Sequence, residues 1–237
     1  MAPSGPFPRL LPDSTSDPAA IARNDWNAFS EIEVLRDHWT VKRWAPGHTG
    51  YYWYLTFDDA ELIDCVAECQ DALGADGVDP VPLDALHVTL MGIGSTKDVV
   101  SDEIDRLISA ARERLSDVMP FVLAVGPLSG SRSAVRFSVA PWDPLLDLHR
   151  LLSTCTSESL SNPTEFVRAK SARFRPHLGI AYNNTDRKAA EVIDAVSRLR
   201  GIHRVNVRVS HVELVVLRRE GRAYRWDTRA ILALGGA

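Results

Sequence analysis

From residue 51 onward, short runs with every second position apolar alternate with longer runs whose apolar residues recur every three or four positions. The first period is typical of a strand with one buried face, and the second of an amphipathic helix. The pattern predicts strands at 51–57, 86–90, 121–128, 134–140 and 176–182, and helices at 58–74, 97–115, 143–160 and 186–201. Residues 203–220 and 223–232 are expected to close the chain with further strands.

The order of these elements repeats. Strand, helix, histidine-bearing strand, helix and strand occur twice, and the two histidines, His87 and His177, are 90 positions apart. A repeat of this kind indicates a duplicated architecture. We therefore expect an α+β fold of two similar lobes, each an antiparallel sheet with outer helices and strands pairing within its own half. The two histidine strands are expected to face each other across a central cleft.

The first 48 residues stand outside the repeat. Residues 1–22 are rich in proline and turn formers, which predicts a loosely attached or disordered segment, and residues 24–39 suggest one short helix. We divide the chain into an N-terminal extension, 1–48, and a bilobal domain, 49–237. Trp39 and Trp44 in the extension either pack it onto the domain or stack on a base at the mouth of the cleft.

Charge and cysteine content narrow the function. The net charge is −4 and the pI about 6.0, so we expect no long duplex nucleic acid as partner, although a local basic pocket can still bind a small phosphate or an RNA end. Three cysteines argue against a disulfide framework, and no apolar run approaches membrane-span length. The expectation is a cytoplasmic protein, a monomer, with no membrane partner.

The two histidine strands present similar faces. In LHVTL (86–90), His87 and Thr89 share one face, and in FRPHLGIAY (174–182), Arg175, His177 and Gly179 share one face. The opposite positions of the second strand, Leu178, Ile180 and Tyr182, are expected in the core. By the same alternation Tyr52, Tyr54, Arg136 and Ser138 are candidates to line the cleft and contact substrate.

Two imidazoles on one cleft suit general acid–base chemistry near neutral pH, because one accepts a proton from an attacking hydroxyl while the other donates one to a leaving oxygen. A hydroxyl two residues after a histidine can stabilise charge on a phosphate between them. This mechanism requires neither a metal nor a cofactor.

The pair of H-x-[S/T]-like motifs in a duplicated α+β chain resembles the 2H phosphoesterase superfamily, and within it the 2′-5′ RNA ligase family, over roughly residues 50 to 230. The resemblance implies a bilobal fold with the motifs in a central cleft. It also implies metal-independent opening of cyclic phosphates or cleavage of phosphodiesters, and in some members the joining of RNA ends. By position it assigns His87 and His177 as the acid–base pair and Thr89 as a phosphate-binding hydroxyl.

The second motif departs from the family pattern, because Gly179 stands where the family has Ser or Thr. Four alternatives stay open. A backbone N–H at the glycine approaches the phosphate closely and compensates, or the chain is a weakened enzyme. The remaining two are a non-catalytic nucleotide- or RNA-binding module and a specialised small-molecule reaction on the same fold. Arg175, on the same face as His177, either contacts phosphate or pairs with a surface acid.

Overall fold

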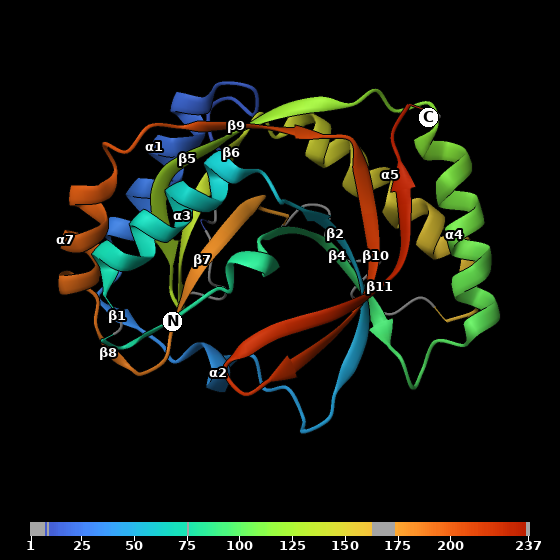
Figure 1. The fold of residues 1–237 in the computed structure, drawn as a ribbon, viewed down its shortest axis with the longest axis horizontal. Coiled ribbons are helices and arrows are strands. Elements are labelled where there is room, and N and C mark those ends of the chain that lie inside the picture. Colours follow the sequence, from blue (N-terminus) through green and yellow to red (C-terminus); the bar gives the residue numbers. More distant parts are fainter. Residues whose placement is uncertain (1–7, 9, 75, 163–173, 236–237) are drawn as a thin grey trace.

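The computed structural model describes residues 8, 10–74, 76–162 and 174–235, and within them two large antiparallel sheets dominate (Figure 1). The first sheet has the order β11 (Ala223–Ala233), β10 (His211–Glu220), β2 (Thr49–Thr56), β4 (His87–Ser95). The second has the order β3 (Val78–Pro80), β7 (His177–Asn183), β6 (Ala134–Ala140), β5 (Phe121–Ser131), β9 (Val205–Val209). A short ribbon pairs β1 (Val34–Leu35) with β8 (Arg187–Lys188).

The predicted alternation of strands and helices after residue 49 is confirmed. The helices are α3 (Ala60–Leu73), α4 (Ser101–Leu115), α5 (Asp143–Ser159) and α7 (Ala190–Leu199). Asp59 caps α3 by accepting from the N–H of Leu62, and Gly74 ends it with a positive φ. The α+β, bilobal class expected from the sequence is therefore the observed one.

The two halves of the repeat exchange strands, contrary to the expectation that each half pairs within itself. β5 comes from the first half but pairs with β6 and β9 in the second sheet, while β10 and β11 close the first sheet on β2. The reason is local, since only two residues separate β5 from β6 and this hairpin commits both strands to one sheet. The helices exchange too: α3 packs with α7 on the second sheet, and α5 packs with α4 on the first (Figure 1).

The N-terminal extension is more ordered than predicted. Helix α1 spans Pro18–Ser30, with Asp17 as its N-cap and Pro18 in its first turn, and Ile21 and Phe29 are buried. The prolines that suggested a loose segment include one at a position that favours a helix start. A second helix, α2 (His38–Val41), is separate, so the single helix expected at 24–39 is wrong. Residues 1–7 and 9 lie outside the described residues, and the division of the chain at residue 48 stays a prediction.

Helix α1 lies against β5 and β6. A Cβ at Gly130 of β5 would overlap the ring of Phe29, so this glycine is what allows the helix to approach the sheet. The extension is thus packed into the body of the domain.

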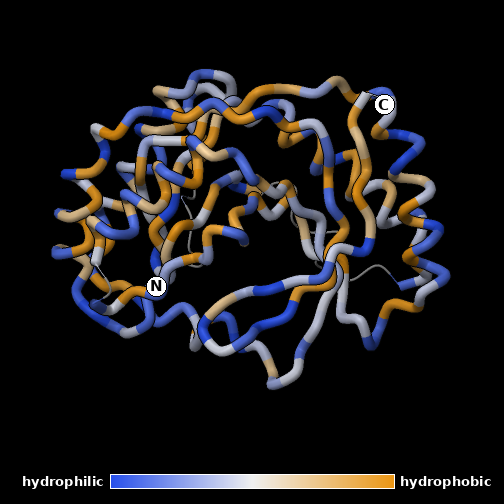
Figure 2. The backbone as a smooth tube through the Cα atoms, viewed as in Figure 1, coloured by the Kyte–Doolittle hydropathy of each residue, from blue (hydrophilic) through white to orange (hydrophobic). Residues whose placement is uncertain are grey.

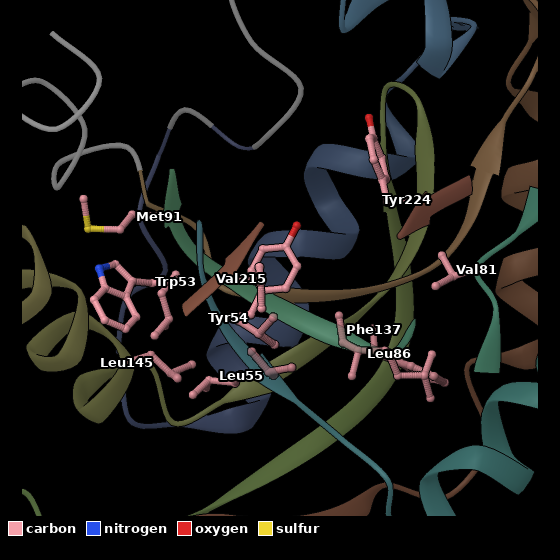
Figure 3. Packing of buried hydrophobic residues seen from close by; sticks show 14 of the residues in the cluster. Trp53, Tyr54, Leu55, Val81, Leu86, Met91, Phe137, Leu145, Val215 and Tyr224 are labelled. Carbon is pink, nitrogen blue, oxygen red and sulfur yellow. The ribbon is translucent and has the colours of Figure 1, made fainter. Parts of the chain in front are cut away.

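Apolar side chains fill the space between each sheet and its helices. Apolar residues follow the strands and the inner sides of the helices, with polar residues outside (Figure 2). On β2, Trp53 is fully buried, and the ring of the next residue, Tyr54, points away from it (Figure 3). The three cysteines are buried and free. Among the described residues, no helix has the length and apolar character needed to cross a membrane.

Candidate active site

His87 and His177 occupy matching places. Each is the first residue of its strand, β4 or β7, and these two strands of different sheets lie close to each other. Nδ1 of His87 lies 2.9 Å from the carbonyl oxygen of Ala85, and Nδ1 of His177 lies 2.8 Å from that of Arg175. In both cases the partner is the carbonyl two residues earlier, so the two halves of the repeat fix their imidazoles in the same way.

These hydrogen bonds determine the tautomer. A carbonyl oxygen only accepts, so Nδ1 carries the proton in both rings and Nε2 carries the lone pair. Burial lowers the pKa of His87 to about 4, and burial together with the nearby Arg136 guanidinium lowers the pKa of His177 to about 3. Both imidazoles are therefore neutral at pH 7 in the free protein, each with one basic nitrogen.

Tyr54 supports the first motif. Its ring stacks on His87 with centroids 4.3 Å apart and planes 11° apart, and Thr89 is its cross-strand partner on β4. Trp226 of β11 closes the arrangement edge-on, 5.3 Å from His87 and 5.2 Å from Tyr54. Tyr54 is almost fully buried, and burial raises the pKa of its phenol, which remains a proton donor. Tyr54 thus lies behind His87 and Thr89, whereas Tyr52 is only partly buried, 6.0 Å from Tyr54 between ring centroids.

The second motif has open space where the first has a hydroxyl. Gly179 does not have a positive φ, and a Cβ built on it would meet nothing within 4 Å. Its strand partner is Arg136, and the next pair is Val135 with Ala181, so Ile180 is an extra residue in β7.

This β-bulge changes the face of Tyr182. The residue was expected in the core with Leu178 and Ile180, but its ring packs 4.2 Å from His38 and 5.5 Å from Tyr224, centroid to centroid. A single extra residue reverses the alternation beyond it, which places Tyr182 on the same side as His177. Tyr182 is buried in the core as expected, but on the face of β7 that carries His177 rather than on the face of Leu178.

Arg136 is not an open substrate contact, contrary to the expectation. Its side chain is fully buried, and NH2 and NH1 donate to the two carboxylate oxygens of Asp25 at 2.9 and 3.3 Å. Ser138 donates to the same carboxylate at 2.7 Å. Arg175 is also largely buried and donates from NH1 to the carbonyl oxygen of Phe174. Helix α1 thus supplies the counter-charge beneath the second motif.

Helix α2 connects the two sheets beside the site. His38 Nδ1 lies 3.2 Å from Ser133 Oγ in the β5–β6 turn, and its Nε2 lies 3.0 Å from the hydroxyl of Tyr224 in β11. Burial lowers the pKa of His38 to about 3, so this bridge is made by a neutral ring. Trp39 donates from Nε1 to Asp79 at 2.7 Å and is buried, which supports the packing alternative for that residue.

Trp44 is only partly buried. Its ring lies 4.7 Å from His48 and 6.3 Å from Tyr52, and it lines a surface hollow with Arg219 and Gly221. The base-stacking alternative stays open for this residue.

Sequence reasoning missed the contributions of Asp25, His38, Tyr182 and Trp226. Asp25 and His38 come from the extension, which lies outside the repeat. Trp226 lies in a strand with ordinary alternation of apolar and polar residues, so nothing in the pattern distinguishes it as a site residue. The described part of the chain contains no group of three or more His, Cys, Asp or Glu side chains placed to hold a metal ion.

Comparisons with known proteins identify the family of this chain. The family model for the 2′-5′ RNA ligase superfamily matches residues 58–221. The chain therefore belongs to the 2′-5′ RNA ligase superfamily, of the 2H phosphoesterase class, and the resemblance drawn from the two histidine motifs is confirmed. No curated protein matches the sequence.

Solved structures share the fold at low identity. TT0787 of Thermus thermophilus is 18% identical with a TM-score of 0.58, covering 80% of this chain and 98% of that one. E. coli LigT, solved in complex with NADP+, is 17% identical with a TM-score of 0.58, covering 79% of this chain and 99% of that one. E. coli LigT has also been solved with 3′-AMP, with the same TM-score and identity and covering 79% of this chain and 98% of that one. At this identity the likeness concerns the fold alone.

Proposed function

We propose that this protein is a metal-independent phosphoesterase that opens a 2′,3′-cyclic phosphate, or cleaves a related phosphodiester, of a nucleotide or RNA end. The observation that carries the proposal is the matched anchoring of His87 and His177, each with Nδ1 on a backbone carbonyl and a basic Nε2. The phosphoesterase class of the family and the 3′-AMP complex of E. coli LigT support a nucleotide phosphate as the ligand.

In the proposed reaction a water oxygen attacks phosphorus while one Nε2 accepts the water proton. The bond from phosphorus to the 2′ or 3′ oxygen breaks, and the other histidine, in its protonated form, donates a proton to that oxygen. Because both rings are neutral in the free protein at pH 7, the acid must acquire its proton as substrate binds. An anionic phosphate between the rings favours this, since it stabilises an imidazolium.

Thr89 is the proposed phosphate donor of the first motif. Thr89 is the cross-strand partner of the buried Tyr54, whose side chain limits the positions that the threonine hydroxyl can take beside the phosphate. Gly179 offers no equivalent side chain.

The test is a panel of 2′,3′-cyclic nucleotides and short RNAs with cyclic ends, assayed in the presence of EDTA. We expect turnover that survives the chelator and falls roughly 10²-fold or more in His87→Ala and in His177→Ala. His203→Ala is the matched control, because His203 is an exposed histidine with only a surface contact to Glu61. Loss of activity in EDTA that a divalent ion restores would contradict the proposal.

The second candidate is a nucleotide-binding protein that has lost catalysis, favoured by Gly179 and by the neutral state of both histidines. It predicts binding of 3′-AMP with no turnover of any cyclic phosphate. A cytoplasmic setting, a monomeric state and independence from cofactors remain predictions from the sequence.

A further inference from the structure

Among the described residues, the second motif has room for a phosphate oxygen at Gly179 but no hydroxyl there to bind it. Gly179 has open space above it. The arginine opposite, Arg136, is buried against Asp25, and Arg175 is largely buried with NH1 on the carbonyl oxygen of Phe174. A donor from another described element would complete this position.

Helix α2 brings a lysine to this region. Its position is fixed by His38, whose ring packs on Tyr182 of the histidine strand β7 and hydrogen-bonds both sheets. Lys42 follows His38 by four residues, and its N–H donates to the His38 carbonyl oxygen at 3.1 Å, which continues the helical turn. Side chains four residues apart leave a helix on the same face. Lys42 thus leaves α2 on the face that carries His38.

Lys42 is exposed, but other groups of the site surround its side chain closely enough to influence its charge. The side chain is exposed to solvent, yet the protein around it lowers the pKa of its amine through desolvation. Its charge acts on His38 and on His177, and it lowers the pKa of both rings. No carboxylate among the described residues forms an ion pair with Lys42. Arg219 differs from Lys42, because its guanidinium already packs over the ring of Trp39.

On the basis of the proposed function, we propose that Lys42 binds the substrate phosphate on the Gly179 side of the cleft and supplies the donor that the second motif lacks. The amine is a mobile point charge on a long stem, which suits a phosphate oxygen. Thr89 and Lys42 then flank the phosphate from the two lobes. Because Lys42 precedes the matched family region, 58–221, this contact belongs to the extension of this chain.

The experiment measures binding of inorganic phosphate to the full chain by calorimetry or by the rise in melting temperature, without any turnover. We expect Lys42→Met to weaken phosphate binding about 10-fold or more and Lys42→Arg to retain most of it. Lys188→Met is the matched control, since Lys188 is an exposed lysine on the β1–β8 ribbon. Lys42→Gln provides a second neutral variant if Lys42→Met proves unstable.

Equal phosphate affinity in wild type and Lys42→Met would overturn the proposal, as would an equal loss in Lys188→Met or an absence of phosphate binding in wild type. The proposed function is separated by one comparison. If the wild-type protein binds phosphate through His87 and His177 but opens no cyclic phosphate, the proposed phosphoesterase activity is wrong. The comparison of wild type with Lys42→Met still tests whether Lys42 binds phosphate.

Discussion

The imidazole of His87 lies flat on the ring of Tyr54, with centroids 4.3 Å apart and planes 11° apart. Thr89 is the cross-strand partner of the same tyrosine, so one buried side chain lies against both residues that we propose act in the first motif. Tyr54 was expected to line the cleft, but it is almost fully buried against His87, so we propose that it positions the first motif rather than contacting substrate.

Tyr54→Phe separates these two contacts, because it keeps the stack on His87 and removes the hydroxyl that acts on Thr89. We expect kcat to fall about 10-fold with KM changed little. Without the Tyr54 hydroxyl, Thr89 is oriented less well, and this orientation matters most in the transition state. Tyr51→Phe is the control, because Tyr51 is on the opposite face of β2. A Tyr54→Phe variant with wild-type kcat would show that the hydroxyl does not orient Thr89.

The buried Asp25–Arg136 pair predicts a large effect on stability. Asp25→Ala leaves a fully buried guanidinium without its carboxylate, and we expect the free energy of unfolding to fall by about 3–5 kcal/mol in urea titrations. Glu158→Ala breaks the exposed pair with Arg114 and should cost less than about 1 kcal/mol. Similar losses in the two variants would contradict a dominant role for the α1 contact.

The pH dependence follows from the two active-site pKa values. NMR titration of the free protein should give imidazole midpoints near 4 for His87 and near 3 for His177, well below the ordinary 6.5. Bound phosphate should raise at least one midpoint, because its negative charge favours the protonated imidazole. Phosphate binding therefore takes up a proton, and the affinity for phosphate should increase as the pH falls. Midpoints near 6.5 in the free protein would contradict the burial of the site.

The same shifts affect folding. A histidine with a folded pKa below its unfolded value binds its proton first in the unfolded state, so the two rings make the protein less stable as the pH falls from about 6.5 toward 3. His87→Gln and His177→Gln should each reduce this decline, as measured by urea unfolding at pH 7 and pH 5. An unchanged pH dependence in both variants would show that other groups control it.

Gly179→Ser tests the open side of the second motif. The position has no positive φ, and a Cβ placed there would have no neighbour within 4 Å, so the variant should fold with a wild-type melting temperature and have equal or higher kcat. Gly130→Ser is the structural control, because its Cβ would overlap the ring of Phe29 and should destabilise the protein strongly. If Gly179→Ser folds but no longer binds 3′-AMP, the cleft needs space there, and the substrate is bulkier than a simple cyclic phosphate.

The sequence was most informative where strands are regular. His87, Thr89, His177 and Gly179 could be assigned to faces because both motifs open a strand, before any irregularity. Tyr182 could not, since the extra residue Ile180 reverses the alternation and leaves no signal in the apolar pattern.

Contacts made by the extension could not be predicted from the sequence either. Asp25 and His38 are far along the chain from Arg136 and Tyr224, and nothing local encodes which strand a helix covers. The exchange of β5 between halves was hidden for a related reason, because a strand has the same apolar period in either sheet.

The central claim is that His87 and His177 act as one acid–base pair. The most direct measurement is kcat for opening a 2′,3′-cyclic nucleotide, in EDTA, by wild type, His87→Ala, His177→Ala and the double variant. Groups that act as a unit are strongly non-additive, so each single variant should lose roughly 10²-fold or more and the double variant little beyond that. Near-wild-type turnover in either single variant, or losses that multiply in the double variant, would contradict the account.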